Sequence, residues 1–185
     1  MARMLQQRLA AMGVAARVET DRRARALVDR PLLAVVSSRL GTSYRRHARV
    51  CRYLIRSMIE ARQSGQVLLV AAGSAIEPWA LRAAELYGVP LVRVTAGCAN
   101  DAKHRRSCWP TVAVDANANR DALVIAMADR VDCVLVRPRG TIDTALRKRL
   151  RCAAGAPTPP TTSAAAPSPS ITTSAAPARS SAVNA

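Results

Sequence analysis

The sequence predicts an α/β fold: a three-layer sandwich in which helices cover both faces of a mainly parallel sheet of about five strands. Short apolar runs alternate with helix-like segments between residues 31 and 152, at lengths typical of strand–helix–strand units. The core has to be built from Ala, Val, Leu, Ile and Met, because the chain holds two Trp, three Tyr and no Phe.

Five apolar runs, each bounded by Gly, Pro or polar residues, are the expected strands. They cover residues 31–38, 67–73, 90–96, 111–114 and 131–137. Pro31 suits the start of the first strand, where a missing backbone N–H costs nothing in the ladder. Most of these runs are apolar throughout, which indicates strands buried on both faces of a parallel sheet.

Four helices are expected after these strands, at residues 42–62, 76–88, 118–129 and about 141–151. Pro78 in the first turn and Gly88 at the end mark the second of them. The first helix shows two faces at helical spacing. One is apolar and the other basic: Tyr44, Ala48, Cys51, Ile55 and Met58 on the first, Arg45, Arg49, Arg52 and Arg56 on the second.

The chain divides into three parts by composition. Residues 1–30 read as an N-terminal helical extension, with Leu5, Leu9 and Met12 on one helix face. Residues 31–152 form the α/β domain. Residues 153–185 consist almost entirely of Ala, Pro, Ser and Thr without apolar periodicity, so we expect a disordered tail.

The formal charge of +16 suits an anionic partner such as nucleic acid or a phosphate-bearing ligand. A solvated, arginine-coated surface from a GC-rich coding sequence explains the same charge without a partner. The five Cys form an odd set without tight spacing, which favours reduced thiols in the cytoplasm. No apolar run approaches the ~18 residues of a membrane-spanning helix, so no membrane association is expected.

Three strand exits carry the chemistry of a phosphate site. They read "SSRLGTS" (37–43), "GSAIE" (73–77) and "RPRGTID" (137–143), each leading into a helix. Helix N-termini at the carboxyl ends of parallel strands present free N–H groups to an anion. Turn and cap chemistry alone also explains each exit taken singly. The chain has no P-loop and no G-x-G-x-x-G motif, which argues against a standard NTPase or NAD-binding unit.

The order of these motifs resembles the SLOG superfamily of Rossmann-like proteins, which includes the Lonely Guy (lysine-decarboxylase-like) phosphoribohydrolases and the DNA-processing protein A family. The similar segments are "AVVSSRLG", "LLVAAGSAIEPWALRAAELYGVPLVRV" and "NRDALVIAMADRVDCVLVRPRGTID", within about residues 31–150. The resemblance implies a Rossmann-like sandwich that binds a nucleotide or nucleotide-derived small molecule, with no further cofactor, and it suggests a homodimer.

By this resemblance, eight residues are expected to bind the ligand at the strand ends: Ser37, Ser38, Arg39, Gly73, Ser74, Arg120, Gly140 and Thr141. The phosphoribohydrolases carry a fuller "PGGxGTxxE" loop. Here "PRGTID" has Arg139 in place of a Gly and offers only Asp143 as a carboxylate. Three functions therefore stay open: ligand binding as a sensor or diverged enzyme, nucleic-acid binding, and nucleotide hydrolysis.

Cys98, His104 and Cys108 fall within eleven residues and invite comparison with a zinc site. The spacing lacks a tight pair and a clear fourth ligand, so no metal is expected. The alternative is a basic loop beside the site, in which Lys103, Arg105 and Arg106 approach an anion.

Overall fold

The computed structural model describes residues 2–96, 108–115 and 119–154. Its centre is a six-stranded sheet in the order β1-β5-β4-β3-β2-β6, and every strand pair is parallel except β1 with β5. The predicted α/β sandwich with a mainly parallel sheet is thereby confirmed. The strands are β1 (Arg17–Thr20), β2 (Leu32–Ser37), β3 (Val67–Ala71), β4 (Leu91–Ala96), β5 (Thr111–Asp115) and β6 (Arg130–Leu135).

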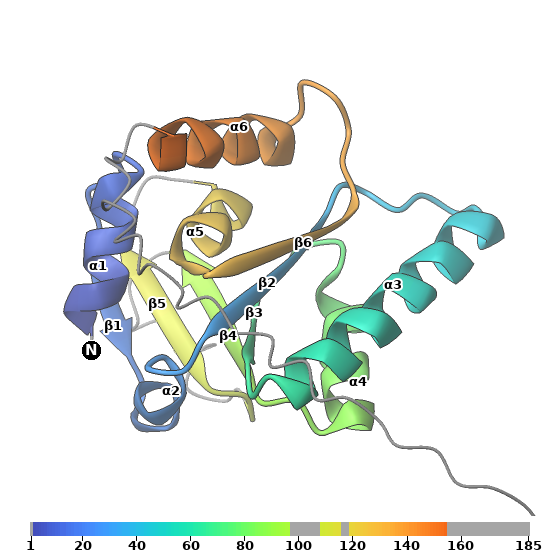
Figure 1. The fold of residues 1–185 in the computed structure, drawn as a ribbon, viewed down its shortest axis with the longest axis horizontal. Coiled ribbons are helices and arrows are strands. Elements are labelled where there is room, and N and C mark those ends of the chain that lie inside the picture. Colours follow the sequence, from blue (N-terminus) through green and yellow to red (C-terminus); the bar gives the residue numbers. More distant parts are fainter. Residues whose placement is uncertain (1, 97–107, 116–118, 155–185) are drawn as a thin grey trace, which may run out of the picture.

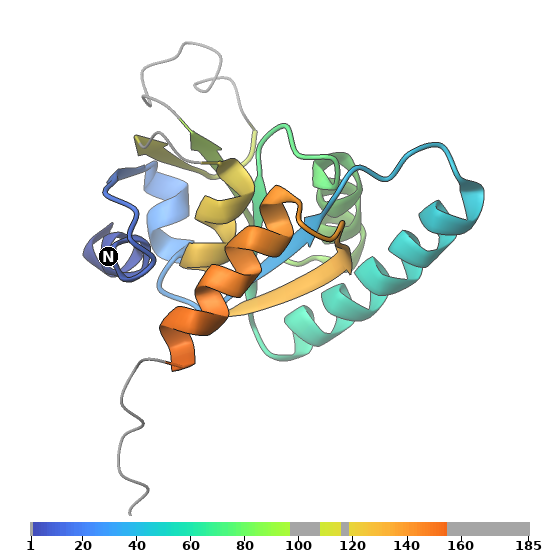
Figure 2. The ribbon, with the colours of Figure 1, turned by 90° about the horizontal axis from the view of Figure 1, so that it is seen from above.

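Six helices in the described residues cover both faces of this sheet (Figures 1 and 2). They are α1 (Ala2–Ala11), α2 (Arg22–Leu27), α3 (Tyr44–Gln63), α4 (Glu77–Tyr87), α5 (Arg120–Met127) and α6 (Thr141–Ala154). Helices α3 and α4 pack on one face, and α1, α2 and α5 pack on the other. Helix α6 lies outside α5 and reaches the sheet beside β6.

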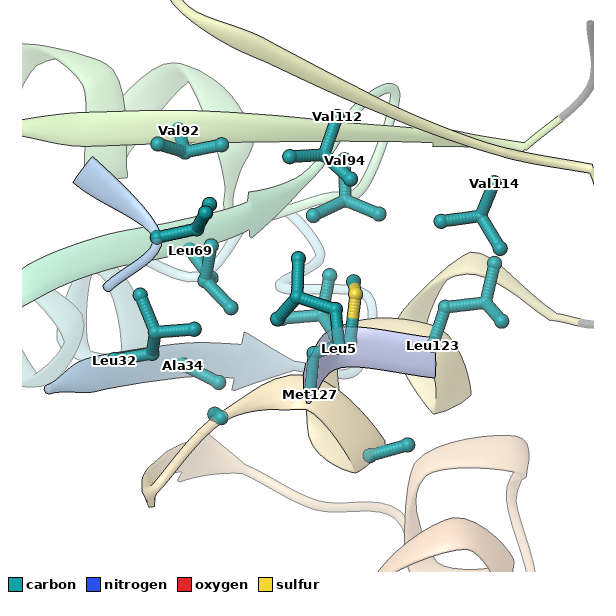
Figure 3. Close-up of a cluster of buried hydrophobic side chains, with 14 of the residues drawn as sticks. Leu5, Leu32, Ala34, Leu69, Val92, Val94, Val112, Val114, Leu123 and Met127 are labelled. Carbon is teal, nitrogen blue, oxygen red and sulfur yellow. The ribbon is translucent and has the colours of Figure 1, made fainter. Parts of the chain in front are cut away.

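The central strands are apolar throughout because they are buried on both faces. In β2, Leu32 and Ala34 point toward α5, while Leu33 and Val35 point toward α3. Figure 3 shows the first of these two cores, where strand residues meet side chains of α1 and α5 such as Leu5 and Met127. The two-residue period of the strands therefore supplies two cores from one sequence run.

The N-terminal segment contains more than the expected helices. Leu5, Leu9 and Met12 are buried, as their helical spacing suggests. Between α1 and α2, however, lies the strand β1, which extends the sheet by pairing antiparallel with β5. Its sequence, "RVET", has only one apolar side chain, so the strand depends on its neighbour for hydrogen bonds and carries little signal of its own.

Helix α3 buries a different face from the apolar one seen in its sequence. Its buried residues are Val50, Leu54, Ser57, Met58 and Ala61, so Met58 alone belongs to the expected set. Tyr44 is 84% exposed and Ile55 41% exposed. The helix carries two apolar stripes, and the positions of the sheet and α4 decide which one is covered.

Helix α5 is fixed at its carboxyl end by two arginines from distant segments. Arg149 of α6 donates to the carbonyls of Ile125, Ala128 and Asp129, and Arg8 of α1 donates to the carbonyl of Met127. The last carbonyls of a helix lack intrahelical partners. A cation at this end also interacts favourably with the negative end of the helix dipole. These contacts join α1, α5 and α6 into one layer.

One expectation concerns a region that the structure hardly covers, and another concerns membrane association. The predicted tail, 153–185, lies outside the described residues apart from the two alanines that end α6. Among the described helices, none is both long and apolar enough to cross a membrane.

Replacing Arg149 with Ala is expected to lower the free energy of unfolding by about 1–3 kcal/mol, because the carbonyls that end α5 lose their donors. Urea denaturation of the full chain measures this change. Arg151→Ala is the matched control: Arg151 lies on the same helix and makes one 3.4 Å contact within it, so its loss should change little. Equal effects of the two substitutions would contradict the capping role.

Candidate functional site

The site lies where the direction of strand addition reverses. From β2 the chain adds β3, β4 and β5 toward one edge, then returns to place β6 on the other side of β2. The helices that follow β2 and β6, α3 and α6, lie on opposite faces of the sheet (Figure 2). The two exits therefore part and leave a crevice beyond the carboxyl ends of these strands, the usual ligand position in open α/β sheets.

A cavity of about 580 Å³ occupies this crevice. All eight residues expected from the sequence line it, although they come from four separate segments of the chain. They are Ser37, Ser38, Arg39, Gly73, Ser74, Arg120, Gly140 and Thr141. The fold thus brings the three strand exits and the start of α5 to one place.

The exits of β2 and β6 are tied to each other directly. The Ser38 amide donates to the carbonyl of Leu135 at 2.7 Å, and the Arg137 amide donates to Oγ of Ser38 at 3.0 Å. Figures 1 and 2 both show the two segments leaving the sheet side by side. Ser38 therefore acts as a link within the cavity wall, which places Arg39 and Arg137 near each other.

The loop beyond Ser38 is anchored from both ends. Leu40 is buried, and Nε2 of His47 donates to the carbonyl of Gly41 at 2.9 Å. The His47 ring also lies 5.4 Å from that of Trp79 on α4, measured between centroids. These contacts hold the loop that carries Arg39 against α3 and α4.

The turn after β3 depends on a buried carboxylate. Glu77 accepts from the Gly73 amide at 2.5 Å with one oxygen, and from Nη2 and Nε of Arg93 on β4 at 2.6 and 2.7 Å with the other. Gly73 has a φ of +72°, which a residue with a side chain adopts only at a cost. Glu77 is the last residue of the segment "GSAIE", but the sequence alone assigns it no role. Its burial on the first turn of α4 is what identifies it as the anchor.

Arg120 closes the same turn from the opposite side. Its guanidinium donates to the carbonyl of Ala72 and lies directly over Gly73, where a Cβ atom would collide with it. Position 73 therefore requires glycine for two reasons: its positive φ, and the close approach of Arg120. The turn at Gly140 is also close, since an added Cβ would lie 3.1 Å from the Arg137 carbonyl oxygen.

Two polar atoms at the cavity have no hydrogen-bond partner in the described structure. They are Oγ of Ser74 and Oδ1 of Asp121, both buried. Burial raises the pKa of the Asp121 carboxyl above its ordinary value, while the neighbouring Arg120 acts in the opposite direction. Buried polar atoms are normally paired, so unpaired ones at a cavity are candidates for contact with a ligand.

The turn before α6 is strained at Arg139, and a hydrogen bond to Asp143 compensates for this strain. Arg139 has a φ of 58°, and its amide donates to Oδ2 of Asp143 at 2.8 Å. Arg147 donates to the other oxygen at 3.1 Å, and the two bonds, the amide's first, lower the pKa of Asp143.

Asp143 therefore stabilises the Arg139 turn, although the sequence motif offered it as the carboxylate of this loop. Asp121 lines the cavity and Asp143 is not among the lining residues. The sequence signal for Asp121 was its place beside Arg120 at a helix start. Arg137 also lines the cavity, and its signal was the first Arg of "RPRG".

Of the cysteine–histidine cluster, only Cys108 falls within the described residues, where it is exposed. Cys98 and His104 lie outside them, and so do Lys103, Arg105 and Arg106 of the expected basic loop.

Glu77→Ala is expected to cost about 3–5 kcal/mol of stability, since it removes the acceptor that the Gly73 amide and Arg93 share in a buried place. Chemical denaturation measures the loss. Glu85→Ala provides the comparison, because Glu85 pairs with Arg82 on the exposed side of the same helix and its loss should cost less than ~1 kcal/mol. A small effect at Glu77 would show that the turn holds without it.

The two aspartates predict stability changes of opposite sign with pH. The pKa of Asp121 is raised in the folded state, so the folded chain bears a penalty once pH exceeds both its unfolded and folded pKa. Asp121→Asn should therefore raise the melting temperature at neutral pH. The gain should shrink as pH falls through the unfolded-state pKa, because Asp121 then becomes protonated in both the folded and the unfolded chain.

The pKa of Asp143 is lowered, so its contribution is present above the unfolded pKa and is lost as pH falls through the folded one. Asp143→Asn should lower the melting temperature at neutral pH. Thermal melts of both variants from pH 3 to 8 test the pair. The same sign for both would contradict the assigned environments.

No family model matches this chain, and no curated protein matches it. Among solved structures, the chain is similar to DNA processing protein A from Streptococcus pneumoniae, at 16% identity and a TM-score of 0.47, over 69% of this chain and 48% of that one. It is also similar to DNA processing protein A from Helicobacter pylori, a structure that describes single-stranded DNA binding, at 15% identity and a TM-score of 0.48, over 75% and 68% of the two chains. The chain thus spans about half of the length of the first protein. These similarities concern the fold alone. The Rossmann-like arrangement expected from the sequence is seen in the strand order and in the helices on both faces of the sheet.

Proposed function

We propose that this chain binds a phosphate-bearing nucleotide, or a small molecule derived from one, in the cavity beyond β2, β3 and β6. The observation that carries the proposal is the convergence of all three strand exits and Arg120 on one cavity of about 580 Å³. A volume of this size suits a ligand larger than an inorganic ion.

The phosphate is assigned to the part of the cavity near the start of α6. Gly140 and Thr141 lie where the first amides of that helix have no intrahelical partner, and the helix dipole favours an anion there. Arg39 and Arg137 stand at the same crevice and supply guanidinium donors, which suit phosphate oxygens.

The nucleoside part is assigned to Ser74 and Asp121. Their unpaired atoms need partners, and a ribose supplies hydroxyls that can donate to the carboxylate and bond with the serine. A ligand with only phosphate oxygens would bring no donor to Asp121. The pairing of cationic groups with one desolvated carboxylate therefore favours a nucleotide over inorganic phosphate.

The proposal concerns binding. If the chain also catalyses hydrolysis, the carboxylate to test is Asp121 and not Asp143. Asp143 holds the Arg139 turn, whereas Asp121 has a raised pKa and lines the cavity. If the chain releases free base from a nucleoside monophosphate, Asp121→Asn should abolish the release.

The test is isothermal titration of the full chain with the four ribonucleoside 5′-monophosphates and with inorganic phosphate. At least one nucleotide should bind more tightly than phosphate. Gly73→Ala should weaken it at least tenfold, because the new Cβ displaces Arg120. Arg82→Ala, on an exposed part of α4, should leave the affinity unchanged. Absence of binding by all four nucleotides would refute the proposal.

Single-stranded nucleic acid is the second candidate, favoured by the exposed arginines of α3, among them Arg45, Arg49 and Arg52. Such binding rests on phosphate contacts and weakens steeply with salt. A short single-stranded DNA in the same titration separates the two. Binding only at low salt, unchanged in Gly73→Ala, would favour the arginine surface over the cavity.

A further inference from the structure

A second cavity, of about 420 Å³, lies beside the first on the α3 side of the sheet. Ser38, Arg39 and Arg137 line both cavities, so these residues form a common wall. We call the second cavity the arginine groove. Its remaining walls come from α3, through Arg46 and Arg49, and from the end of β6.

The arginine groove concentrates positive charge that the described part of the chain does not neutralise. Four guanidinium groups line it, from Arg39, Arg46, Arg49 and Arg137, and no acidic residue is among its lining. Within residues 2–96, 108–115 and 119–154, none of the four takes part in an ion pair. Arg46 and Arg49, three residues apart on one helix, also repel each other.

Elsewhere on the same helix and the same strand, two arginines are paired with acids. Arg56 binds Glu60 at 2.9 Å, and Arg130 binds Glu60 at 2.6 Å and Asp132 at 2.8 Å. The chain thus places acids beside arginines farther along α3 and β6 but none at the groove. Among the described residues, Arg45, Arg52 and Arg62 of α3 also have no ion pair, so what distinguishes the groove is the convergence of four guanidinium groups on one cavity.

The floor of the groove is apolar. Val50 and Val134 are buried beneath it, and Leu135 is partly buried. An anion held over such a floor is screened less by water than on an open surface, so its attraction to the guanidinium groups is stronger. The groove therefore has the properties of a subsite for an anionic group, not those of a solvated face alone.

We propose that the arginine groove is a second phosphate subsite, so that the ligand of this chain carries at least two covalently linked phosphate groups. The proposal rests on the proposed function, which fills the first cavity. The shared wall places the two phosphates on either side of Arg39 and Arg137, with Arg46 and Arg49 as partners of the outer one.

Two kinds of ligand share this chemistry. In a nucleoside diphosphate the second phosphate follows the first through a single oxygen. In a 5′-phosphorylated dinucleotide, a ribose separates the two phosphates. Both present two anionic groups to the common wall, and direct comparison of the two series decides between them.

The experiment is titration of the full chain with three series: the four ribonucleoside 5′-monophosphates, the corresponding 5′-diphosphates, and the corresponding 5′-phosphorylated dinucleotides. The second phosphate should raise affinity about tenfold or more in one series, as charge-assisted hydrogen bonds do. Arg46→Ala combined with Arg49→Ala should remove this gain and leave monophosphate binding unchanged. Arg45→Ala combined with Arg52→Ala, on the same helix but outside the groove lining, should leave the gain intact.

A gain with diphosphates identifies a pyrophosphate chain, and a gain with dinucleotides identifies a phosphodiester; either supports the subsite. Monophosphate binding without any gain would overturn the subsite and leave the proposed function standing. A gain that survives the Arg46 and Arg49 substitutions, or that is lost equally with Arg45 and Arg52, would also overturn it. No binding in any series would overturn both proposals.

Discussion

The packing of α5 against the sheet is the interaction on which both the core and the cavity depend. Helix α5 contacts β2, β3 and β4, and its buried side chains include Leu123, Val124 and Met127. Its carboxyl end is fixed by Arg8 and Arg149, and its amino end carries Arg120 and Asp121 into the cavity. Since the helix is rigid, the contacts at one end determine where the functional side chains at the other end lie.

Three turns of the cavity wall are held by groups to which no part of the ligand is assigned. Glu77 and Arg93 fix the Gly73 turn, Asp143 fixes the Arg139 turn, and His47 fixes the loop of Arg39. Among the described residues, Oγ of Ser74 and Oδ1 of Asp121 are left without a hydrogen-bond partner. Leaving polar groups unpaired costs stability, and such a cost is expected where a site is organised before its ligand arrives.

Charge has two roles in this chain, which composition alone cannot separate. Arg8 and Arg149 are structural, since they bind backbone carbonyls at the end of α5. Arg56 and Arg130 are paired with acids. The arginines of the two cavities differ because they converge without acids among the groove's lining residues. Only their positions in the fold distinguish a ligand-binding arginine from one that caps a helix.

The sequence by itself determined the order of elements from residue 31 onward and all eight residues that meet at the cavity. It succeeded there because apolar period, Gly and Pro act locally, and because parallel strands bring their carboxyl ends to one edge. Arg120, which lies on no strand exit, was expected only from the resemblance to the SLOG superfamily. It did not reveal β1, whose four residues gain strand geometry only from β5. Nor did it determine which apolar stripe of α3 is buried, or that Asp121 and not Asp143 lines the cavity. Tertiary structure decided these features, because burial and hydrogen bonding depend on neighbours that are distant in the chain.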